Sequence, residues 1–413
     1  MGRRHLMGLH LNKAHWYSPV SVFIWIFISF LFLGFREQIS TWLIAEYQPL
    51  IVALLSTNLF VAIFERYAFL VVRMQKKGTF LSFQRLLQSI LNVVFILSYC
   101  HFIAKDFYAL IFASVFSLLI TTIISIFVER KFWFQSISIS KIEISKIFKY
   151  GIPFAPACLI SILFEGMDKM FLRVFTNFNE MGLYAAGFKI VALLNIIQVG
   201  FAVFWTPVSF EHYEKHPEDT SLYERTFKYM SFILILLGLL IITFKDVIIL
   251  LFAQNYREAS TIVPLLLFIP IMYILTEITC LGVYFKKKSA WQLLIFAALL
   301  LLGILFNFTF IPWLGAKGAA VAVALAYCAY FYIRTGVSIR LYPMDFMLIK
   351  TTLAFFMFFI VAGINTFVPD RNIGIICSII AIVLYSIFHI PLIKEIVVYS
   401  KQIVIESLPK RNE

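Results

Sequence analysis

Four charged side chains lie within one long apolar stretch of the chain, between positions 151 and 175: Glu165, Asp168, Lys169 and Arg173. A spacing of four residues places Glu165, Lys169 and Arg173 along one face of a helix, with Asp168 beside them. A charge at bilayer depth costs roughly 3 kcal/mol or more unless it faces a partner or water. These side chains therefore predict a polar pathway or binding site inside a membrane protein.

The composition of the chain is that of a membrane protein. Hydrophobic residues make up 62% of the chain and charged residues 14%, and the mean hydropathy is +0.91. Soluble domains average roughly 25% charged residues. The first residues, MGRRHLMGLHLNKAHWY, are basic and polar, so we expect no cleavable signal peptide. The predicted class is an all-α polytopic membrane protein.

The cysteines and the net charge predict neither a metal site nor a nucleic-acid partner. The five cysteines lie in apolar runs at irregular spacing, at Cys100, Cys158, Cys280, Cys328 and Cys377. We expect them to pack as small core residues, and we expect no cofactor. The net charge of +13 is explained by a basic cytoplasmic face beside anionic lipid.

About twelve apolar runs are long enough to span a membrane. They are 17–35, 43–64, 86–104, 107–128, 151–175, 182–207, 228–252, 261–284, 290–311, 318–340, 346–368 and 373–392. If the N-terminus is cytoplasmic and the spans alternate, most of the 35 basic residues fall on the cytoplasmic side. This asymmetry predicts an even number of spans and two cytoplasmic termini.

Polar residues inside several spans follow single helical faces. These faces are Asn58 with Arg66, Arg85 with Gln88 and Asn92, Lys189 with Asn195 and Gln198, Tyr273 with Glu277, and Tyr327 with Tyr330 and Arg334. Several helices that each present one polar face suit a shared central cavity. The candidate substrate-binding residues are Arg66, Glu165, Asp168, Lys169, Arg173, Lys189, Asn195, Gln198 and Glu277. The last two spans lack such faces, so we expect them at the periphery.

Structural roles remain alternatives for several of these residues. Arginines near span ends, such as Arg66 and Arg334, can extend to lipid headgroups. Asn195 and Gln198 can join helices by hydrogen bonds. Glu165 and Lys169 can form a buried pair that fixes packing.

A set of short motifs is spread over the central and later parts of the chain: Tyr150–Pro153 with Pro156, Asp168–Lys169, Gly182–Ala186 leading to Lys189, Phe204–Pro207, Tyr256 with Ala259, and Gly315–Ala320. This combination resembles the polysaccharide flippases of the multidrug/oligosaccharidyl-lipid/polysaccharide exporter superfamily. The resemblance implies two pseudo-symmetric helical bundles followed by two additional helices. The expected division is 1–149 with four spans, 150–342 with six, and 343–413 with the last two and a cytoplasmic tail.

Two features depart from the pattern of that family. Its first bundle has six helices, whereas four spans precede Tyr150 here, so the first helix pair of the family is the part expected to be missing. Arg173 stands where members of the family usually carry a small or apolar residue.

The function implied by the resemblance is translocation of an undecaprenyl-pyrophosphate-linked oligosaccharide repeat across the bacterial inner membrane, for O-antigen, capsule or exopolysaccharide synthesis. We expect Arg66, Lys169, Arg173 and Lys189 to receive the pyrophosphate and the amide, tyrosine and carboxylate side chains to bind sugar. The expected partners are this lipid-linked substrate, membrane lipids, and polymerases and glycosyltransferases of the same pathway.

The two alternatives are a small-molecule antiporter and a membrane enzyme, which would be either a polymerase or an acyltransferase. A cation-coupled multidrug antiporter of the same superfamily requires carboxylates, which Asp168 and Glu277 provide, but the cationic excess argues against it. A membrane polysaccharide polymerase is expected to carry a long outer loop, which the chain lacks. An acyltransferase needs a histidine placed as a general base, whereas His212 and His216 fall on a loop and His389 in the last span. We therefore expect a transporter and not an enzyme.

Overall fold

The computed structural model describes residues 34–44, 46–75, 77–133, 155–286 and 288–395, together with positions 28, 30, 32 and 398. These residues form helices and turns and contain no strand. The prediction of an all-α polytopic membrane protein is confirmed. The main helices are α3 (Arg36–Ile44), α4 (Pro49–Met74), α5 (Gly78–Phe102), α6 (Tyr108–Val128), α9 (Ala155–Phe175), α10 (Phe178–Lys215), α11 (Ser221–Ile248), α13 (Phe268–Thr279), α15 (Ser289–Leu341), α16 (Leu348–Phe367) and α17 (Arg371–Phe388), with the short helices α7 (Arg130–Trp133), η2 (Ile249–Leu251), η3 (Gln254–Thr261), α12 (Val263–Leu266) and α14 (Leu281–Phe285) between them.

Eight helices in the described part of the chain are long and apolar enough to cross a membrane. A ninth results if η3 and the segment Val263–Thr279, which meet at 57°, form one broken span. Helix α9 has 21 residues but carries four charges, and α15 contains the two predicted spans 290–311 and 318–340. Most of the predicted first span, 17–35, lies outside the described residues.

The predicted boundaries of the second span, 43–64, are wrong, because α4 runs from Pro49 to Met74. Proline is favoured in the first helical turn, where its missing N–H would have no intrahelical partner. The apolar run is interrupted at Glu65 because that residue is charged. Its side chain is nevertheless buried, with Oε1 3.0 Å from Nη1 of Arg85 on α5, so the helix continues through it.

Contacts divide the chain into two units, Met1–Ile144 and Ser145–Glu413. In the N-terminal unit, α6 packs against both α4 and α5. Every fourth residue on its buried face is small: Ala109, Ala113, Ser117, Thr121 and Ser125. Small side chains let helix backbones approach closely in a membrane. Hydrogen bonds from α4 and α5 to serines of α6 add to this packing, at 2.9 Å for Asn58 and 3.5 Å for Asn92.

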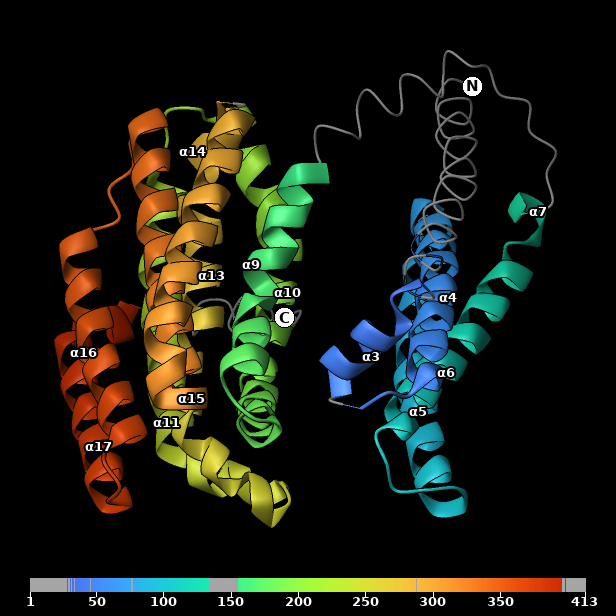
Figure 1. The fold of residues 1–413 in the computed structure, drawn as a ribbon. Coiled ribbons are helices and arrows are strands. Elements are labelled where there is room, and N and C mark those ends of the chain that lie inside the picture. The colour runs from blue at the N-terminus through green and yellow to red at the C-terminus, as the bar shows by residue number, and fades with distance from the viewer. Residues whose placement is uncertain are drawn as a thin grey trace, which may run out of the picture. The chain divides into compact units, whose positions relative to one another are not determined.

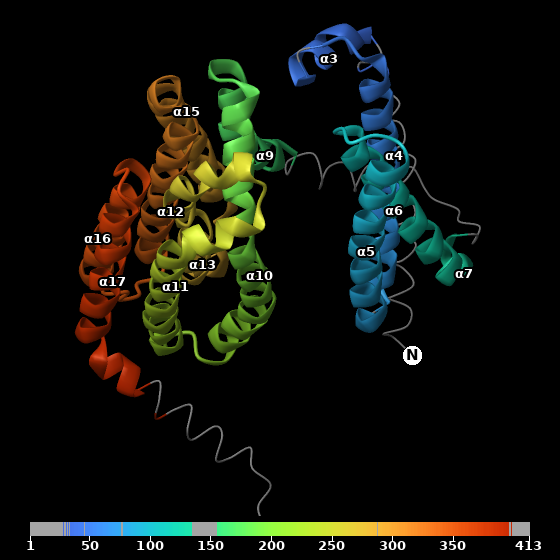
Figure 2. The same ribbon diagram turned by 90° about the horizontal axis from the view of Figure 1, so that it is seen from below.

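The C-terminal unit is the larger helical bundle (Figures 1 and 2), and its core is rich in aromatic side chains. Tyr223, Phe227, Phe268, Phe331 and Phe358 are among its fully buried side chains. Many large apolar residues on the outside of the bundle are exposed, which is the arrangement expected of helices that face lipid.

Helix α15 is bent at Gly315, which has φ 55° and ψ −130°. This left-handed conformation favours glycine because a Cβ would crowd the backbone. Glu180, in the first turn of α10, accepts a hydrogen bond of 2.7 Å from the N–H of Ala316. The carboxylate therefore caps the second half of α15 and joins it to the start of α10.

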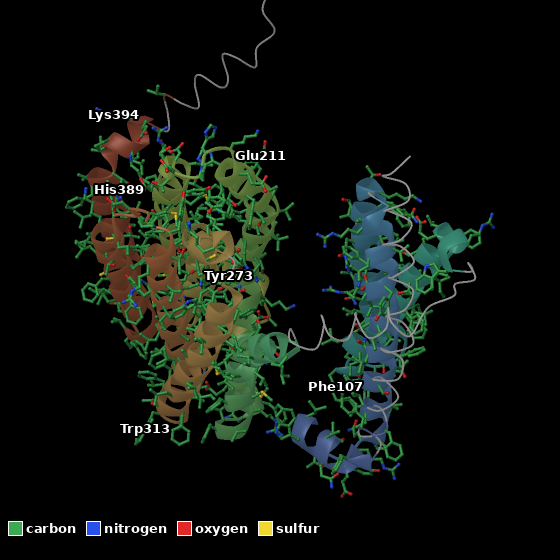
Figure 3. The ribbon with its side chains drawn as sticks, turned by 90° about the horizontal axis from the view of Figure 1, so that it is seen from above. Phe107, Glu211, Tyr273, Trp313, His389 and Lys394 are labelled. Atoms are coloured by element: carbon green, nitrogen blue, oxygen red, sulfur yellow. The ribbon has the colours of Figure 1, made fainter. Side chains whose placement is uncertain are left out.

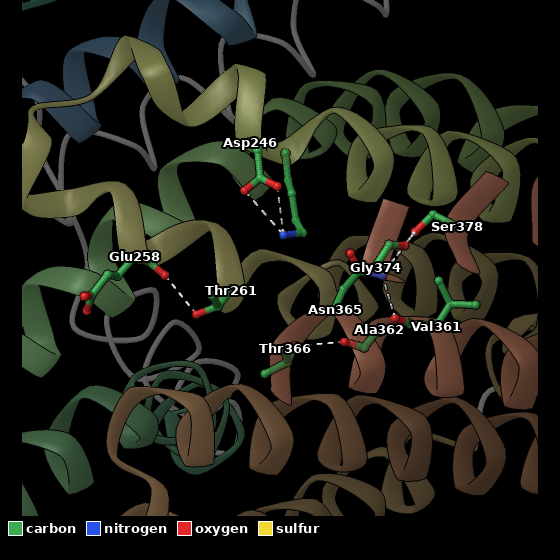
Figure 4. A network of polar contacts seen from close by, with 10 residues as sticks. Asp246, Glu258, Thr261, Val361, Ala362, Asn365, Thr366, Gly374 and Ser378 are labelled. Atoms are coloured by element: carbon green, nitrogen blue, oxygen red, sulfur yellow. Dashed lines mark hydrogen bonds and ion pairs between the residues drawn. The ribbon is translucent and has the colours of Figure 1, made fainter. Parts of the chain in front are cut away.

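Helices α16 and α17 lie side by side at one edge of the C-terminal unit, where they contact α11 and α12 (Figures 1 and 2). Asn365 connects the pair: its amide nitrogen donates to the carbonyl of Gly374 at 3.2 Å and to Ser378 Oγ at 3.1 Å (Figure 4). A Cβ on Gly374 would lie 2.8 Å from Asn365 Oδ1, so glycine is required for this close approach.

Candidate functional site

Helix α9 carries the four charges identified in the sequence, and a short turn positions it against α10. The helix ends at Phe175, and α10 begins at Phe178 with Asn177 as its N-cap. The side-chain oxygen of Asn177 accepts from the N–H of Glu180 at 3.0 Å, which satisfies one of the free donors of the helix start. A short polar turn therefore joins the two helices.

A polar cavity of about 210 Å³ lies inside the C-terminal unit. Its walls come from α9, α13, α14 and α15, and its lining residues are Ser161, Phe164, Glu165, Tyr273, Glu277, Tyr284, Gln292, Phe296, Tyr327, Tyr330 and Arg334. We call this the polar cavity. Two of the polar faces predicted from the sequence meet in it, on α13 and the second half of α15. Of the charged stripe predicted on α9, Glu165 reaches the cavity. Tyr273 marks its position among the helices (Figure 3).

Arg334 organises one side of the polar cavity. Its guanidinium is buried, and Nη1 lies 3.4 Å from Oε1 of Glu277 on α13. Nη1 also donates to the hydroxyl of Tyr330, and Nη2 donates to the hydroxyl of Tyr284 at 2.6 Å. Because these groups already engage the guanidinium, little of its charge remains for a ligand.

Glu165 faces the same cavity from α9. Arg334 is paired with Glu277, so the negative charge of Glu165 has no matching cation in the cavity wall. The structure shows no ion pair for Glu165 among the residues it describes. Tyrosine rings complete the wall. The Tyr273 and Tyr330 rings stack with their centroids 6.2 Å apart, and the centroid of the Tyr327 ring lies 6.0 Å from that of Tyr330. The cavity thus offers hydroxyl donors, an amide, a free carboxylate and aromatic faces.

Asp168 points to a different environment. Its side chain is buried, and the hydroxyl of Tyr184 on α10 donates to Oδ2. The other oxygen, Oδ1, is also buried and has no hydrogen-bond partner among the described residues. Asp168 therefore does not line the polar cavity, although it lies less than one helical turn from Glu165.

The predicted cations lie outside the polar cavity. Lys169 is exposed, with Nζ 5.2 Å from the centroid of the Phe188 ring. Arg173 is half-buried, with Cζ 4.5 Å from the centroid of the Phe178 ring. Lys189 is exposed on α10. Each cation over an aromatic face is held by attraction to the ring quadrupole.

The remaining candidates are separate from this group. Asn195 and Gln198 are half-buried on α10 and do not line the polar cavity. Arg66 is exposed on α4 and belongs to the N-terminal unit. Of the nine candidate residues, the polar cavity brings together Glu165 and Glu277 alone.

Sequence reasoning does not select Tyr284, Gln292 and Phe296 for the site. Tyr284 ends one predicted span and Gln292 begins the next, and such residues are ordinary at membrane interfaces. Gln292 Nε2 donates to the Tyr284 hydroxyl at 2.9 Å, so both belong to the Arg334 network. Arg334 itself lies on a predicted polar face, with headgroup contact as its alternative; burial beside Glu277 excludes that role in this structure.

Comparison with known proteins supports the resemblance seen in the motifs. The family described as polysaccharide biosynthesis protein matches residues 10–212. Among solved structures, the lipid II flippase MurJ in an inward closed conformation is similar with a TM-score of 0.67 and 15% identity, covering 93% of this chain and 84% of MurJ. An outward-facing multidrug resistance MATE family transporter of the MOP superfamily gives a TM-score of 0.55 and 15% identity, covering 83% and 78% of the two chains. No curated protein sequence matches the chain.

Proposed function

We propose that this multi-pass membrane protein, which matches the polysaccharide biosynthesis family and has the fold of MOP-superfamily transporters, is a flippase for lipid-linked oligosaccharides. Its substrate would be an undecaprenyl-pyrophosphate-linked repeat unit, moved from the cytoplasmic to the outer leaflet of the bacterial inner membrane. The termini would be cytoplasmic. Glycosyltransferases would act on the substrate before transport, and polymerases after it. The proposed activity is transport, with no bond made or broken.

The polar cavity carries this proposal. A glycan presents many hydroxyl groups and apolar ring faces, and it cannot cross hydrocarbon without partners for those hydroxyls. Tyrosine hydroxyls, the Gln292 amide and carboxylates can donate to or accept from such groups. The stacked rings of Tyr273 and Tyr330 add an apolar surface for a sugar ring.

The charges around the polar cavity favour different binding positions for the sugar and for the pyrophosphate of the proposed substrate. Arg334 is already engaged by Glu277, Tyr330 and Tyr284, so Glu165 gives the polar cavity a negative balance. An anion is disfavoured there. Lys169 and Lys189 are exposed and remain available to the two phosphate groups. The sugar would therefore enter the polar cavity while the pyrophosphate contacts lysines of α9 and α10, and the prenyl tail would stay in lipid.

A second candidate function is cation-coupled export of small molecules. The observation that favours it is the buried Oδ1 of Asp168, which has no hydrogen-bond partner among the described residues. A buried carboxylate oxygen without a donor can take up a proton or a cation. The similarity of fold to a MATE transporter agrees with this candidate, but the aromatic and hydroxyl-rich cavity favours the glycan carrier.

Surface glycan in a strain that lacks its own flippase tests the proposal. Lys169→Gln and Lys189→Gln remove a charge but keep most of the length of each side chain, and we expect the double variant to abolish export. Charge-assisted hydrogen bonds to phosphate are stronger than neutral ones, and the double variant removes both of the proposed lysine contacts. Lys169→Arg keeps the charge with another shape, so it should retain part of the activity.

Matched controls come from an exposed pair on α10. Lys215→Gln and Glu211→Gln remove charges that pair with each other at 2.6 Å on the surface, and they should leave export unchanged. Glu165→Gln should reduce export through the polar cavity. Protein levels are measured by immunoblot. Full export by the Lys169→Gln/Lys189→Gln variant would refute the phosphate contact, and loss of export in the controls would show that the assay does not report on the site.

A further inference from the structure

A second cavity lies at the end of the C-terminal unit where α11 and α16 begin and α17 ends. Its volume is about 420 Å³, and it shares no lining residue with the polar cavity. The walls come from the first four turns of α11, the linker before α16, the first turns of α16, and the end of α17 with the residues that follow it. Figure 3 shows His389, one of its lining residues, toward the end of the unit opposite Trp313. We call it the end cavity.

The end cavity is charged at its mouth and apolar at depth. Arg225, Lys228 and Lys350 lie at the mouth, near the starts of α11 and α16. Ile235 and Ala354 lie farther along the same helices. A helix rises 1.5 Å per residue, so the lining of α11 from Arg225 to Ile235 extends about 15 Å. This gradient along the helix axes matches a molecule with a polar head and a hydrocarbon tail.

The carboxylates of the end cavity are already bound within the protein. Glu224 Oε1 accepts from Thr220 Oγ1 at 2.8 Å and from the N–H of Asp345 at 3.0 Å. Asp345 Oδ1 accepts from the N–H of Met347 at 2.9 Å. Lys228 is likewise engaged, because its Nζ lies 3.0 Å from Glu395 Oε2.

Two further cations, Arg225 and Lys350, line the end cavity. Among the described residues, neither Arg225 nor Lys350 forms a hydrogen bond or an ion pair. Lys350 lies in the first turn of α16, which begins without a side-chain cap at Met347. The start of a helix carries partial positive charge, and the Asp345 carboxylate lies two residues before the N-cap Met347, so a further anion near Lys350 would also be favoured there. Arg225 faces the same cavity, and its charge acts on the Glu395 carboxylate without a hydrogen bond or an ion-pair contact to it.

We propose that the end cavity binds a membrane phospholipid with an anionic headgroup. The phosphate would contact Arg225 and Lys350, because guanidinium and ammonium groups form strong hydrogen bonds to phosphate oxygens. An acyl chain would lie against the apolar residues Phe227, Ile235 and Ala354. Basic pockets between membrane helices commonly bind such headgroups. This site is independent of the glycan in the polar cavity.

Thermal unfolding of the purified full chain in detergent, titrated with phosphatidylglycerol, tests the proposal. The unfolding temperature should rise with phosphatidylglycerol and much less with phosphatidylcholine. Each basic group near an anionic lipid surface contributes about the same free energy to binding, and the variant Arg225→Gln/Lys350→Gln removes two such groups. It should therefore bind phosphatidylglycerol about 30-fold more weakly. The control Arg340→Gln/Lys394→Gln removes two exposed cations that do not line the end cavity, and it should bind like the parent protein.

Two further arms identify the source of the phosphate. Ala354→Phe fills the apolar part of the end cavity while keeping both cations, so it should also weaken phosphatidylglycerol binding. Soluble glycerol 1-phosphate, which has the headgroup chemistry without an acyl chain, should give no comparable stabilisation. Equal binding by the parent and the Arg225→Gln/Lys350→Gln variant would overturn the proposal. So would equal stabilisation by phosphatidylcholine, or by glycerol 1-phosphate alone.

Discussion

Arg334 and Glu277 are 57 positions apart in the chain, yet Nη1 of the arginine lies 3.4 Å from Oε1 of the glutamate. The arginine is on α15 and the glutamate on α13, and both line the polar cavity. Each charge would be costly at this depth without the other. The pair therefore makes a polar wall tolerable inside a helical bundle that is otherwise apolar.

Removing one member of this pair should be worse than removing both. Arg334→Met leaves Glu277 without its cation, and we expect a loss of roughly 3 kcal/mol in stability. Arg334→Met/Glu277→Met should recover part of that loss, with a coupling energy of about 0.5–3 kcal/mol. Thermal unfolding of the purified variants in detergent provides the measurement. Strictly additive effects of the two substitutions would contradict the pairing.

The hydrogen bond between Tyr184 and Asp168 predicts that the stability cost of Tyr184→Phe depends on the charge of Asp168. Tyr184→Phe removes the donor to Oδ2 and leaves the buried carboxylate with no hydrogen-bond partner among the described residues. The expected destabilisation, measured by thermal unfolding, is roughly 1–3 kcal/mol. Asp168→Asn removes the charge and should relieve much of this cost in the Tyr184→Phe background.

The same Asp168→Asn substitution separates the two candidate functions. A cation-coupled antiporter that uses Asp168 should lose transport in this variant, whereas the glycan flippase should keep a measurable part. Surface glycan and drug export are measured in parallel. Drug export that the parent supports and Asp168→Asn loses, with no surface glycan restored by either protein, would favour the antiporter.

Gly315 should not tolerate a side chain. In Gly315→Ala the new Cβ would lie 2.5 Å from Glu180 Oε2, and the residue would keep a positive φ of 55°. The backbone conformation alone costs about 1–2 kcal/mol for a residue with a Cβ. Gly336→Ala is the matched control, because a Cβ there would have no neighbour within 4 Å and alanine favours a helix. A thermal unfolding temperature that falls in the first variant and not in the second would agree with the bend.

The arrangement of α10 and α15 makes the predicted topology testable. Glu180 contacts Ala316, so Asn179 lies near the bend of α15. The half-helix from Ser289 to Gly315 extends about 39 Å, which places Ser289 at the opposite end. In a cysteine-free background, Asn179→Cys should be labelled from outside intact cells and Ser289→Cys should not. The reverse pattern would invert the topology.

The periodicity of polar residues predicts more of the polar cavity than single charges do. Tyr273 with Glu277, and Tyr327 with Tyr330 and Arg334, form polar faces of separate helices in the sequence, and the structure brings these faces together. Each face can be predicted because helical spacing is a local property. The pairing of Arg334 with Glu277 cannot, because it depends on how α13 and α15 pack.

Asp168 and α4 show where local reasoning fails. Asp168 lies beside the stripe of Glu165 and Lys169 in the sequence. Its position around the axis of α9 differs from that of Glu165, however, and its side chain therefore contacts Tyr184 and not the polar cavity. The sequence predicts the end of the second span near Glu65 because a charge interrupts an apolar run there. The partner that makes this charge acceptable, Arg85, comes from another helix, so the longer α4 is not predictable from its own residues.

All the side chains that line the polar cavity come from one continuous stretch of the chain, from Ser161 to Arg334. A chimera that exchanges this stretch between two related proteins would therefore transfer an entire set of cavity walls, including both halves of the Arg334–Glu277 pair. Exchange of this one gene segment would thus carry the walls that the C-terminal unit contributes to the proposed glycan site as one set.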